Sequence, residues 1–219
     1  MRRPTCGDRI RNFFPSRYPF GLLEIPYRII LASASPRRKE LLGRIVSEFE
    51  IIPPDLDEEA FNQPVPWQTA RDLAFEKASL IHGDNPEALV IGGDTVVALP
   101  VQGGYDQLGK PKDTWDAVRM LKRLSGIEHL VITGVCLKWP GGTKSFEVTS
   151  GVKFRKLSES EIKEYVACGE SMDKAGSYAV QGRGASFIEG MRGSLTNVMG
   201  FPVDEVREEL AKLTLDIPS

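Results

Sequence analysis

Two adjacent arginines mark the start of a predicted helix in the stretch RIILASASPRRKELLG, residues 28–43. Ser35 stands where a helix N-cap belongs, and Pro36 suits the first helical position because no intrahelical donor is lost there. The first turn of a helix carries partial positive charge and favours acidic side chains by about 0.3–1 kcal/mol. Arg37 and Arg38 oppose that preference, so the pattern indicates an anion-binding site. Two solvated arginines on an exposed turn are the alternative interpretation.

Carboxylates and a lysine suited to phosphate chemistry follow along the chain. The stretch DLDEEAF places Glu58 in an acidic turn, and Lys77 borders the apolar stripe of a predicted helix over residues 67–83. Asp94 interrupts the apolar run ALVIGGDTVVAL, where a carboxylate costs free energy unless it is paired or bound to a metal. An aspartate that only caps the adjoining glycine turn is the alternative for Asp94. For Glu58 and Lys77 taken singly, the alternative is a solvated surface role.

Lys110 precedes Pro111 in the Gly-rich stretch GYDQLGKP, which resembles a P-loop only in part. A P-loop needs Ser or Thr after the lysine to bind Mg²⁺, and proline lacks the backbone donor that a phosphate cradle uses. We therefore reject the P-loop and keep Lys110 as one more candidate phosphate ligand. Taken together, the basic groups would neutralise a polyphosphate, the carboxylates would hold Mg²⁺ or Mn²⁺, and one carboxylate would orient the attacking water.

Composition narrows the function classes. The chain of 219 residues is 41% hydrophobic and 26% charged, with a net charge of −2. This charge argues against a nucleic-acid partner, and no apolar run approaches the roughly 20 residues that span a bilayer, so we expect no membrane partner. Cys6, Cys136 and Cys168 are too widely spaced for a disulfide framework or a CxxC metal site. These features predict a cytoplasmic protein.

Residues 1–27 differ in character from the rest, with five Arg against one Asp and one Glu. We expect a peripheral, flexible extension there, followed by a single domain over residues 28–219. An organellar transit peptide is the alternative, although the segment is not Ser-rich and has no clean amphipathic period.

Strands that alternate with helices predict an α/β fold. The predicted strands cover residues 28–32, a segment that ends at Pro53, 88–99 with an interruption at the two glycines, 129–139 and 146–157. The predicted helices cover residues 36–42, 67–83, 113–126, 158–169 and 202–213. Exposed apolar residues in the last of these helices would permit a homodimer.

The chain resembles the Maf family of nucleoside triphosphate pyrophosphatases. The matching stretches run in family order from about Arg28 to the last helix: LASASPRRKELL, DLDEEAF, LAFEKA, IGGDTVV, GKP, SGIEHLVITGV and DKAGSYAVQGRGASFIEGMRGSLTNVMGFP. The resemblance implies an elongated, two-lobed α/β fold with a central mixed sheet and an active-site cleft, related to the inosine-triphosphate pyrophosphatase architecture. It also implies cleavage of a nucleoside triphosphate to the monophosphate and pyrophosphate, with Mg²⁺ or Mn²⁺ as cofactor.

The same resemblance assigns roles by motif position. It makes Asp94 the expected proton acceptor, and Glu58 and Asp94 the expected metal ligands. Substrate binding falls to Ser35, Arg37, Arg38, Glu58, Lys77, Thr95, Lys110 and Gln181. Among these, Arg37, Thr95 and Gln181 lie where the family distinguishes substrate classes, and here they are similar to the branch that acts on dTTP and UTP.

Three other functions remain open at this point. A nucleotide-binding regulator of cell division without useful turnover is disfavoured by the retained carboxylates and lysines. A 7-methyl-GTP pyrophosphatase is disfavoured by Thr95 and Gln181. A phosphatase that releases single phosphates differs only in the bond that is cut.

Overall fold

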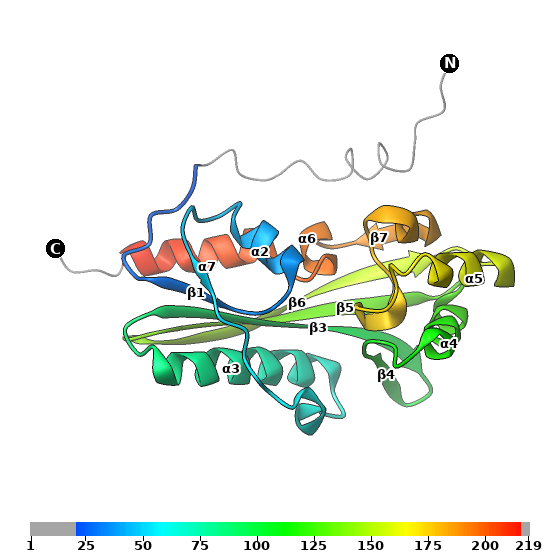
Figure 1. Cartoon of the computed structure of the whole chain (residues 1–219), viewed down its shortest axis with the longest axis horizontal. Helices are drawn as coiled ribbons and strands as arrows, with labels where there is room; N and C mark the ends of the chain where they lie inside the picture. The colour runs from blue at the N-terminus through cyan, green and yellow to red at the C-terminus, as the bar shows by residue number, and fades with distance from the viewer. Residues whose placement is uncertain (1–20, 216–219) are drawn as a thin grey trace, which may run out of the picture. The chain divides into compact units, whose positions relative to one another are not determined.

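The computed structural model describes residues 21–215 (Figure 1). The predicted α/β fold with a mixed sheet is confirmed: seven strands form one sheet in the order β2-β1-β3-β5-β6-β7, and β4 pairs with β3. β1 is parallel to β2 and β3, whereas β3–β4 and β6–β7 are antiparallel. The strands are β1 Ile29–Ala32, β2 Glu50–Ile51, β3 Leu89–Val101, β4 Gly104–Leu108, β5 Glu128–Trp139, β6 Gly142–Phe154 and β7 Ile188–Arg192.

Helices connect these strands. The α-helices are α2 Pro36–Leu42, α3 Pro66–Asp84, α4 Thr114–Leu124, α5 Glu159–Ala167, α6 Leu195–Val198 and α7 Val203–Leu215. Three short 3₁₀ helices are η1 Glu58–Phe61, η2 Ala175–Ser177 and η3 Gly182–Phe187. None of the helices within residues 21–215 is both long enough and apolar enough to cross a membrane.

The described residues form two compact units, each built from separate stretches of chain. Unit 1 contains residues 97–131 and 150–195, and unit 2 contains residues 21–96, 132–149 and 196–215. The predicted boundary between an extension over residues 1–27 and a domain over 28–219 stays a prediction, because most of that extension lies outside the described residues.

Local signals placed the helices correctly. Ser35 accepts a hydrogen bond from the Arg38 amide at the start of α2, with Pro36 in the first turn. The capping box of α5 is complete, because Ser158 and Glu161 each bond the other's backbone. These bonds satisfy amide donors that the first helical turn leaves free.

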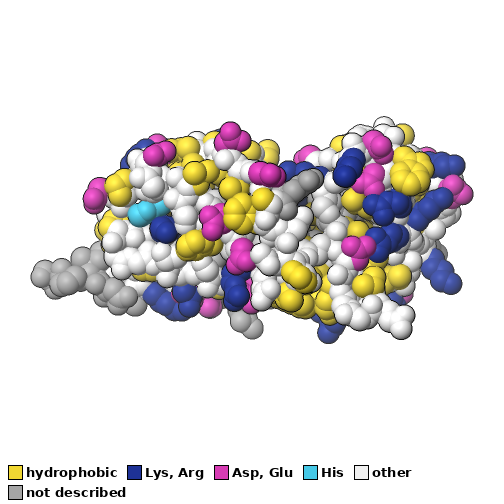
Figure 2. Space-filling view, turned by 90° about the horizontal axis from the view of Figure 1, so that it is seen from below, with side chains coloured by type: hydrophobic (Ala, Val, Ile, Leu, Met, Phe, Trp, Pro, Cys, Tyr) yellow, Lys and Arg dark blue, Asp and Glu magenta, His cyan; other side chains and the backbone are white. Residues whose placement is uncertain are grey.

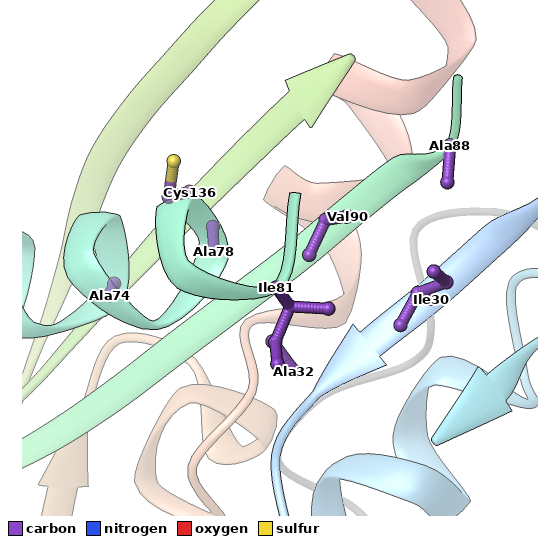
Figure 3. Close-up of a cluster of buried hydrophobic side chains, with 8 residues drawn as sticks. All are labelled: Ile30, Ala32, Ala74, Ala78, Ile81, Ala88, Val90 and Cys136. Carbon is purple, nitrogen blue, oxygen red and sulfur yellow. The ribbon is translucent and has the colours of Figure 1, made fainter. Parts of the chain in front are cut away.

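In unit 2, α3 covers one face of the strands, and α2 and α7 cover the other (Figure 1). The apolar stripe predicted for α3 is buried, and small side chains dominate its contact with the sheet. Figure 3 shows this cluster of Ile30, Ala32, Ala74, Ala78, Ile81, Ala88, Val90 and Cys136. On its outward side α3 still exposes Phe75 and Leu80 in part, and hydrophobic side chains gather over this region of the surface (Figure 2).

Two glycines allow this close packing. A Cβ on Gly92 in β3 would lie 2.2 Å from the Ala74 carbonyl oxygen, and one on Gly134 in β5 would lie 2.1 Å from the Ala70 carbonyl oxygen. Real Cβ atoms essentially never approach so closely. The backbone of α3 therefore rests directly on β3 and β5 at positions that exclude a side chain.

The structure corrects two predictions about strands. β3 runs without a break through the two glycines that were expected to interrupt it. Gly92 serves the packing of α3, and Gly93 faces the Arg38 side chain, so neither forms a turn. Residues 104–108, which lie outside the predicted strands, form the antiparallel strand β4. In α7, Val206 and Leu210 are fully buried, whereas Val203 and Leu213 are half-exposed, so the homodimer stays a prediction.

Candidate active site

The first polar cluster lies on the α3 side of β3. The Lys77 ammonium nitrogen, Nζ, lies 2.7 Å from Asp94 Oδ1 and 2.7 Å from Glu58 Oε1. Lys77 and Asp94 are buried, whereas the Glu58 side chain is 48% exposed. We call these three residues the carboxylate–lysine cluster. A buried carboxylate is tolerated when it is paired, so the ion pair with Lys77 explains how β3 accommodates Asp94.

The packing of α3 accounts for this contact. Lys77 directly precedes Ala78, whose backbone lies over Gly92. Side chains alternate between the two faces of a strand, so Asp94 points to the same face as Gly92, toward α3. The glycine therefore brings the helix close enough for Lys77 to reach the carboxylate.

A second group of polar contacts surrounds Arg38, which lies in the first turn of α2. Its guanidinium donates from Nε to the Gly200 carbonyl oxygen at 2.9 Å, from Nη1 to Ser33 Oγ at 3.2 Å and from Nη2 to Thr95 Oγ1 at 3.0 Å. Ser33 also accepts from the Ser35 amide at 3.2 Å. Arg38 thus ties the start of α2 to β3 and to the segment before α7.

The charge environment of Arg38 links it to the first cluster. Burial lowers the pKa of its guanidinium, and the nearby Arg37 cation adds to that effect. The carboxylates of Asp94 and Glu58 oppose it and raise the pKa. Arginine nevertheless stays protonated in proteins, so a permanent cation lies within electrostatic reach of both carboxylates.

The contacts of Arg38 continue through two threonines. Thr95 Oγ1 lies 3.0 Å from Thr133 Oγ1 of β5, and Thr133 donates to the Asn197 carbonyl oxygen at 3.1 Å. We call the series Arg38, Thr95, Thr133 and Asn197 the hydroxyl relay. Strand alternation places Thr95 on the opposite face of β3 from Asp94, so the two polar groups lie on opposite faces of one strand.

Both groups lie where β3 extends past the end of β1. The pairing between the two strands stops at Ala32 and Gly92, and Asp94 and Thr95 follow Gly92 within three residues. Crevices at the carboxyl ends of parallel strands are the usual ligand sites of open α/β sheets.

A family model described as Maf-like protein matches residues 28–213. The chain belongs to the Maf family. The resemblance inferred from the motifs is therefore confirmed.

Curated Maf relatives match over most of their length. The chain is 49% identical to a dTTP/UTP pyrophosphatase of Syntrophus aciditrophicus, over 84% of this chain and 88% of the relative. It is 46% identical to a dTTP/UTP pyrophosphatase of Aquifex aeolicus, over 86% and 96% respectively. For a protein of the same name from Thermococcus kodakarensis the identity is 45%, over 87% and 99%.

Of the nine substrate and catalytic candidates that the Maf pattern assigns, seven fall in unit 2. These are Ser35, Arg37, Arg38, Glu58, Lys77, Asp94 and Thr95. Lys110 and Gln181 belong to unit 1, and both are exposed. Their roles, like those of the other seven, stay predictions.

The backbone next to Gln181 is firmly held within unit 1. The Ala179 amide donates to the Tyr165 hydroxyl at 3.1 Å, and the Arg183 amide donates to Glu170 Oε2 at 3.1 Å. Gly182 between them has a φ of 77°, which favours glycine. An exposed side chain on such a turn can contact a ligand with little backbone rearrangement.

Sequence reasoning missed Ser33, Thr133, Asn197 and Gly200. Thr133 and Asn197 are fully buried, and a buried threonine or asparagine has no distinctive spacing that separates it from ordinary core positions. Ser33 stands in the motif ahead of Ser35, and its distance from the predicted N-cap was the one signal that could have identified it.

The donor set fits a hard divalent cation only in company with a ligand. Within residues 21–215, no three His, Cys, Asp or Glu side chains form a group that could hold a metal alone. Mg²⁺ is often held by one or two carboxylates together with substrate phosphates. Glu58 and Asp94 supply that number, and their shared approach to Lys77 shows that their oxygens converge.

Proposed function

We propose that this chain hydrolyses dTTP and UTP to the nucleoside monophosphate and pyrophosphate, with modified pyrimidine nucleotides as further candidate substrates. The observation that carries the proposal is the carboxylate–lysine cluster, with the Arg38 cation within electrostatic reach, in a Maf chain whose relatives from Syntrophus aciditrophicus and Aquifex aeolicus are named dTTP/UTP pyrophosphatases. Two carboxylates and two cations at one strand end match the needs of phosphoryl chemistry, where catalysis is mostly positioning and charge stabilisation.

In this proposal the chain's own residues divide the work. Arg38 and Lys77 offset the negative charge of the triphosphate, and Asp94 orients the attacking water and accepts its proton. The water oxygen bonds to the α-phosphorus or the β-phosphorus as the bond from that same atom to the α,β-bridging oxygen breaks. Pyrophosphate is the leaving group in the first case and the nucleoside monophosphate in the second, and both cases give the same two products. Lys110 is assigned to the phosphates, Ser35 to the same pocket, and Arg37, Thr95 and Gln181 to substrate discrimination.

Glu58 and Asp94 would hold Mg²⁺ or Mn²⁺ together with the phosphates. When bound, such an ion neutralises phosphate charge and polarises water. The Gln181 amide can both donate and accept hydrogen bonds, which suits the edge of a pyrimidine. A cytoplasmic location remains a prediction.

Product analysis tests the proposed function. Purified full-length protein with Mg²⁺ or Mn²⁺ is given dTTP, UTP, CTP, GTP and 7-methyl-GTP in separate reactions. We expect pyrophosphate with dTMP or UMP. Turnover of 7-methyl-GTP alone would contradict the roles of Arg37, Thr95 and Gln181, release of single phosphates would contradict the bond assignment, and binding without turnover would favour the regulator.

A further inference from the structure

The hydroxyl relay has a fixed direction. A carbonyl oxygen can only accept, so the contact between Thr133 Oγ1 and the Asn197 oxygen uses the single proton of the Thr133 hydroxyl. In the contact between the two threonine hydroxyls, Thr95 must therefore be the donor. With its own proton committed to Thr133, Thr95 meets Arg38 Nη2 as an acceptor.

This direction limits what Thr95 can do with a substrate. Phosphate oxygens at neutral pH accept hydrogen bonds, and the one proton of Thr95 is already donated to Thr133. Thr95 therefore cannot bind a phosphate oxygen without breaking the relay. Its contribution to a phosphate site passes through the arginine that it orients.

We infer that Thr133 is a positioning residue, which sets the orientation of Arg38 by holding the Thr95 hydroxyl with its lone pair toward Nη2. The guanidinium has five N–H donors, and its three contacts with Gly200, Ser33 and Thr95 use one each from Nε, Nη1 and Nη2. One donor on each terminal nitrogen remains for an anion. The role of Thr133 rests on the proposed function, in which Arg38 is a phosphate ligand.

The location of Thr133 suits this role. Thr133 is fully buried in β5, so it is not exposed to a ligand that binds from solvent. Its hydroxyl contacts the Thr95 hydroxyl in β3 and the Asn197 backbone carbonyl in α6. Valine has nearly the same shape but offers neither donor nor acceptor. Thr133→Val would leave the Thr95 proton without its acceptor, and the hydroxyl could then turn its hydrogen toward the guanidinium. Thr133→Ser keeps the hydroxyl and loses only a methyl group.

A double-mutant cycle tests the inference. The wild type, Thr133→Val, Thr95→Val, the double variant and Thr133→Ser are compared by calorimetric binding of inorganic pyrophosphate and by steady-state kinetics with UTP. We expect Thr133→Val to weaken pyrophosphate binding about fivefold to tenfold, which is the size of one hydrogen bond between neutral groups. KM for UTP should rise by a similar factor while kcat changes less than about twofold.

The control and the cycle separate positioning from general packing. Thr133→Ser should bind pyrophosphate within about twofold of the wild type, and Thr133→Val should add no further loss once Thr95 is valine. Additive losses, a serine variant as weak as the valine variant, or no effect of Thr133→Val would overturn the inference. Should valine prevent folding, Thr133→Ala replaces it in the same cycle.

The two readouts keep this inference distinct from the proposed function. A wild type that binds pyrophosphate but cleaves neither UTP nor dTTP would contradict the proposed function, and the cycle in pyrophosphate binding would still decide the role of Thr133. A wild type without affinity for pyrophosphate would overturn the role given to Thr133, because Arg38 would then have no anion to orient toward.

Discussion

On one face of β3 the polar contacts join full charges, and on the other they run through neutral hydroxyls. Lys77 meets two carboxylates on the α3 side, whereas Thr95 meets an arginine, a second threonine and, through it, a backbone carbonyl on the opposite side. Two neighbouring residues of the same strand, Asp94 and Thr95, therefore lie in sites of different physical character.

The two groups of contacts differ in how freely their members can change hydrogen-bond partners. An ammonium has three donors and no fixed plane, so Lys77 can shift from carboxylate to phosphate while the net charge stays balanced. The hydroxyl relay has no such freedom, because each proton already has one assigned acceptor. Charge contacts suit groups that must act on a ligand, and directional hydrogen bonds suit groups that must hold another group still.

The largest effect is expected from the charged face. Asp94→Asn keeps the shape and one oxygen but removes the charge and the basic site, so kcat should fall by about 10²–10⁴-fold. Binding of UTP, followed by calorimetry under non-turnover conditions, should persist. Asp84→Asn at the exposed end of α3 is the matched control and should leave kcat unchanged. If binding disappeared together with turnover, metal ligation would be the better role for Asp94.

The next largest effect is expected at Gly92, which allows α3 to pack closely against β3. Gly92→Ala forces a methyl group to within 2.2 Å of the Ala74 carbonyl oxygen and should lower the free energy of unfolding by about 3 kcal/mol. Chemical denaturation measures this loss. The control is Gly83→Ala in α3, where a new Cβ has nothing within 4 Å. This substitution should be neutral or should raise the free energy of unfolding by up to about 1 kcal/mol. Equal losses in both variants would contradict the packing argument.

A smaller effect should separate the two adjacent arginines. Arg38→Lys cannot reproduce a fork that reaches the Gly200 carbonyl, Ser33 and Thr95 together, and should lower the free energy of unfolding by about 2 kcal/mol. Arg37→Lys should change it by no more than about 0.5 kcal/mol. Thermal unfolding of both variants compares them directly, and matched losses would remove the structural distinction between the two residues.

The smallest effect is expected on folding stability as the pH falls, and it concerns His129, which belongs to neither group of contacts on β3. In unit 1, burial lowers the pKa of His129 to about 4, against opposing effects of the Ile127 backbone and the Glu128 charge. The unfolded chain, with an ordinary histidine pKa near 6.5, then binds more protons than the folded one between about pH 6.5 and 4. Folding stability should therefore decrease as pH falls through that window, by about 1 kcal/mol between pH 7 and 5.5.

His129→Gln removes this titration. Its unfolding free energy should be flatter than that of the wild type across the same pH range, whatever its absolute value at pH 7. A wild-type slope that is unchanged in the variant would assign the acid sensitivity to other groups.

Sequence patterns predicted the parts of the fold that depend on local chemistry. Ser35 accepts a hydrogen bond from an amide in the adjoining helical turn, and Pro36 has no amide proton that would need a partner, so the effect of both residues is visible in the sequence. The placement of Lys77 at the border of the apolar stripe also followed from helical periodicity, and Asp94 was singled out because a carboxylate inside an apolar run needs a partner.

The remainder depends on contacts between distant segments. Gly92 looked like a break in the strand because its close approach to Ala74 can be known only from the packing of α3. Thr133 and Asn197 join the relay across the sheet, from positions 38 and 64 residues away from Thr95 and Thr133 respectively. Strand β4 was missed since its polar residues carry no apolar alternation.

The contact between α3 and the sheet glycines also sets a tolerance. Successive residues advance about 1.5 Å along a helix, and a slide of that size would drive an alanine methyl or a carbonyl oxygen of α3 into β3 or β5. The contacts at Gly92 and Gly134 therefore fix the position of α3 along its own axis. A lysine side chain has four rotatable bonds and would ordinarily sample a wide volume, but here its origin is fixed by backbone contact. The position of Lys77 in the site therefore depends on Gly92 and Gly134, two residues that have no side chain.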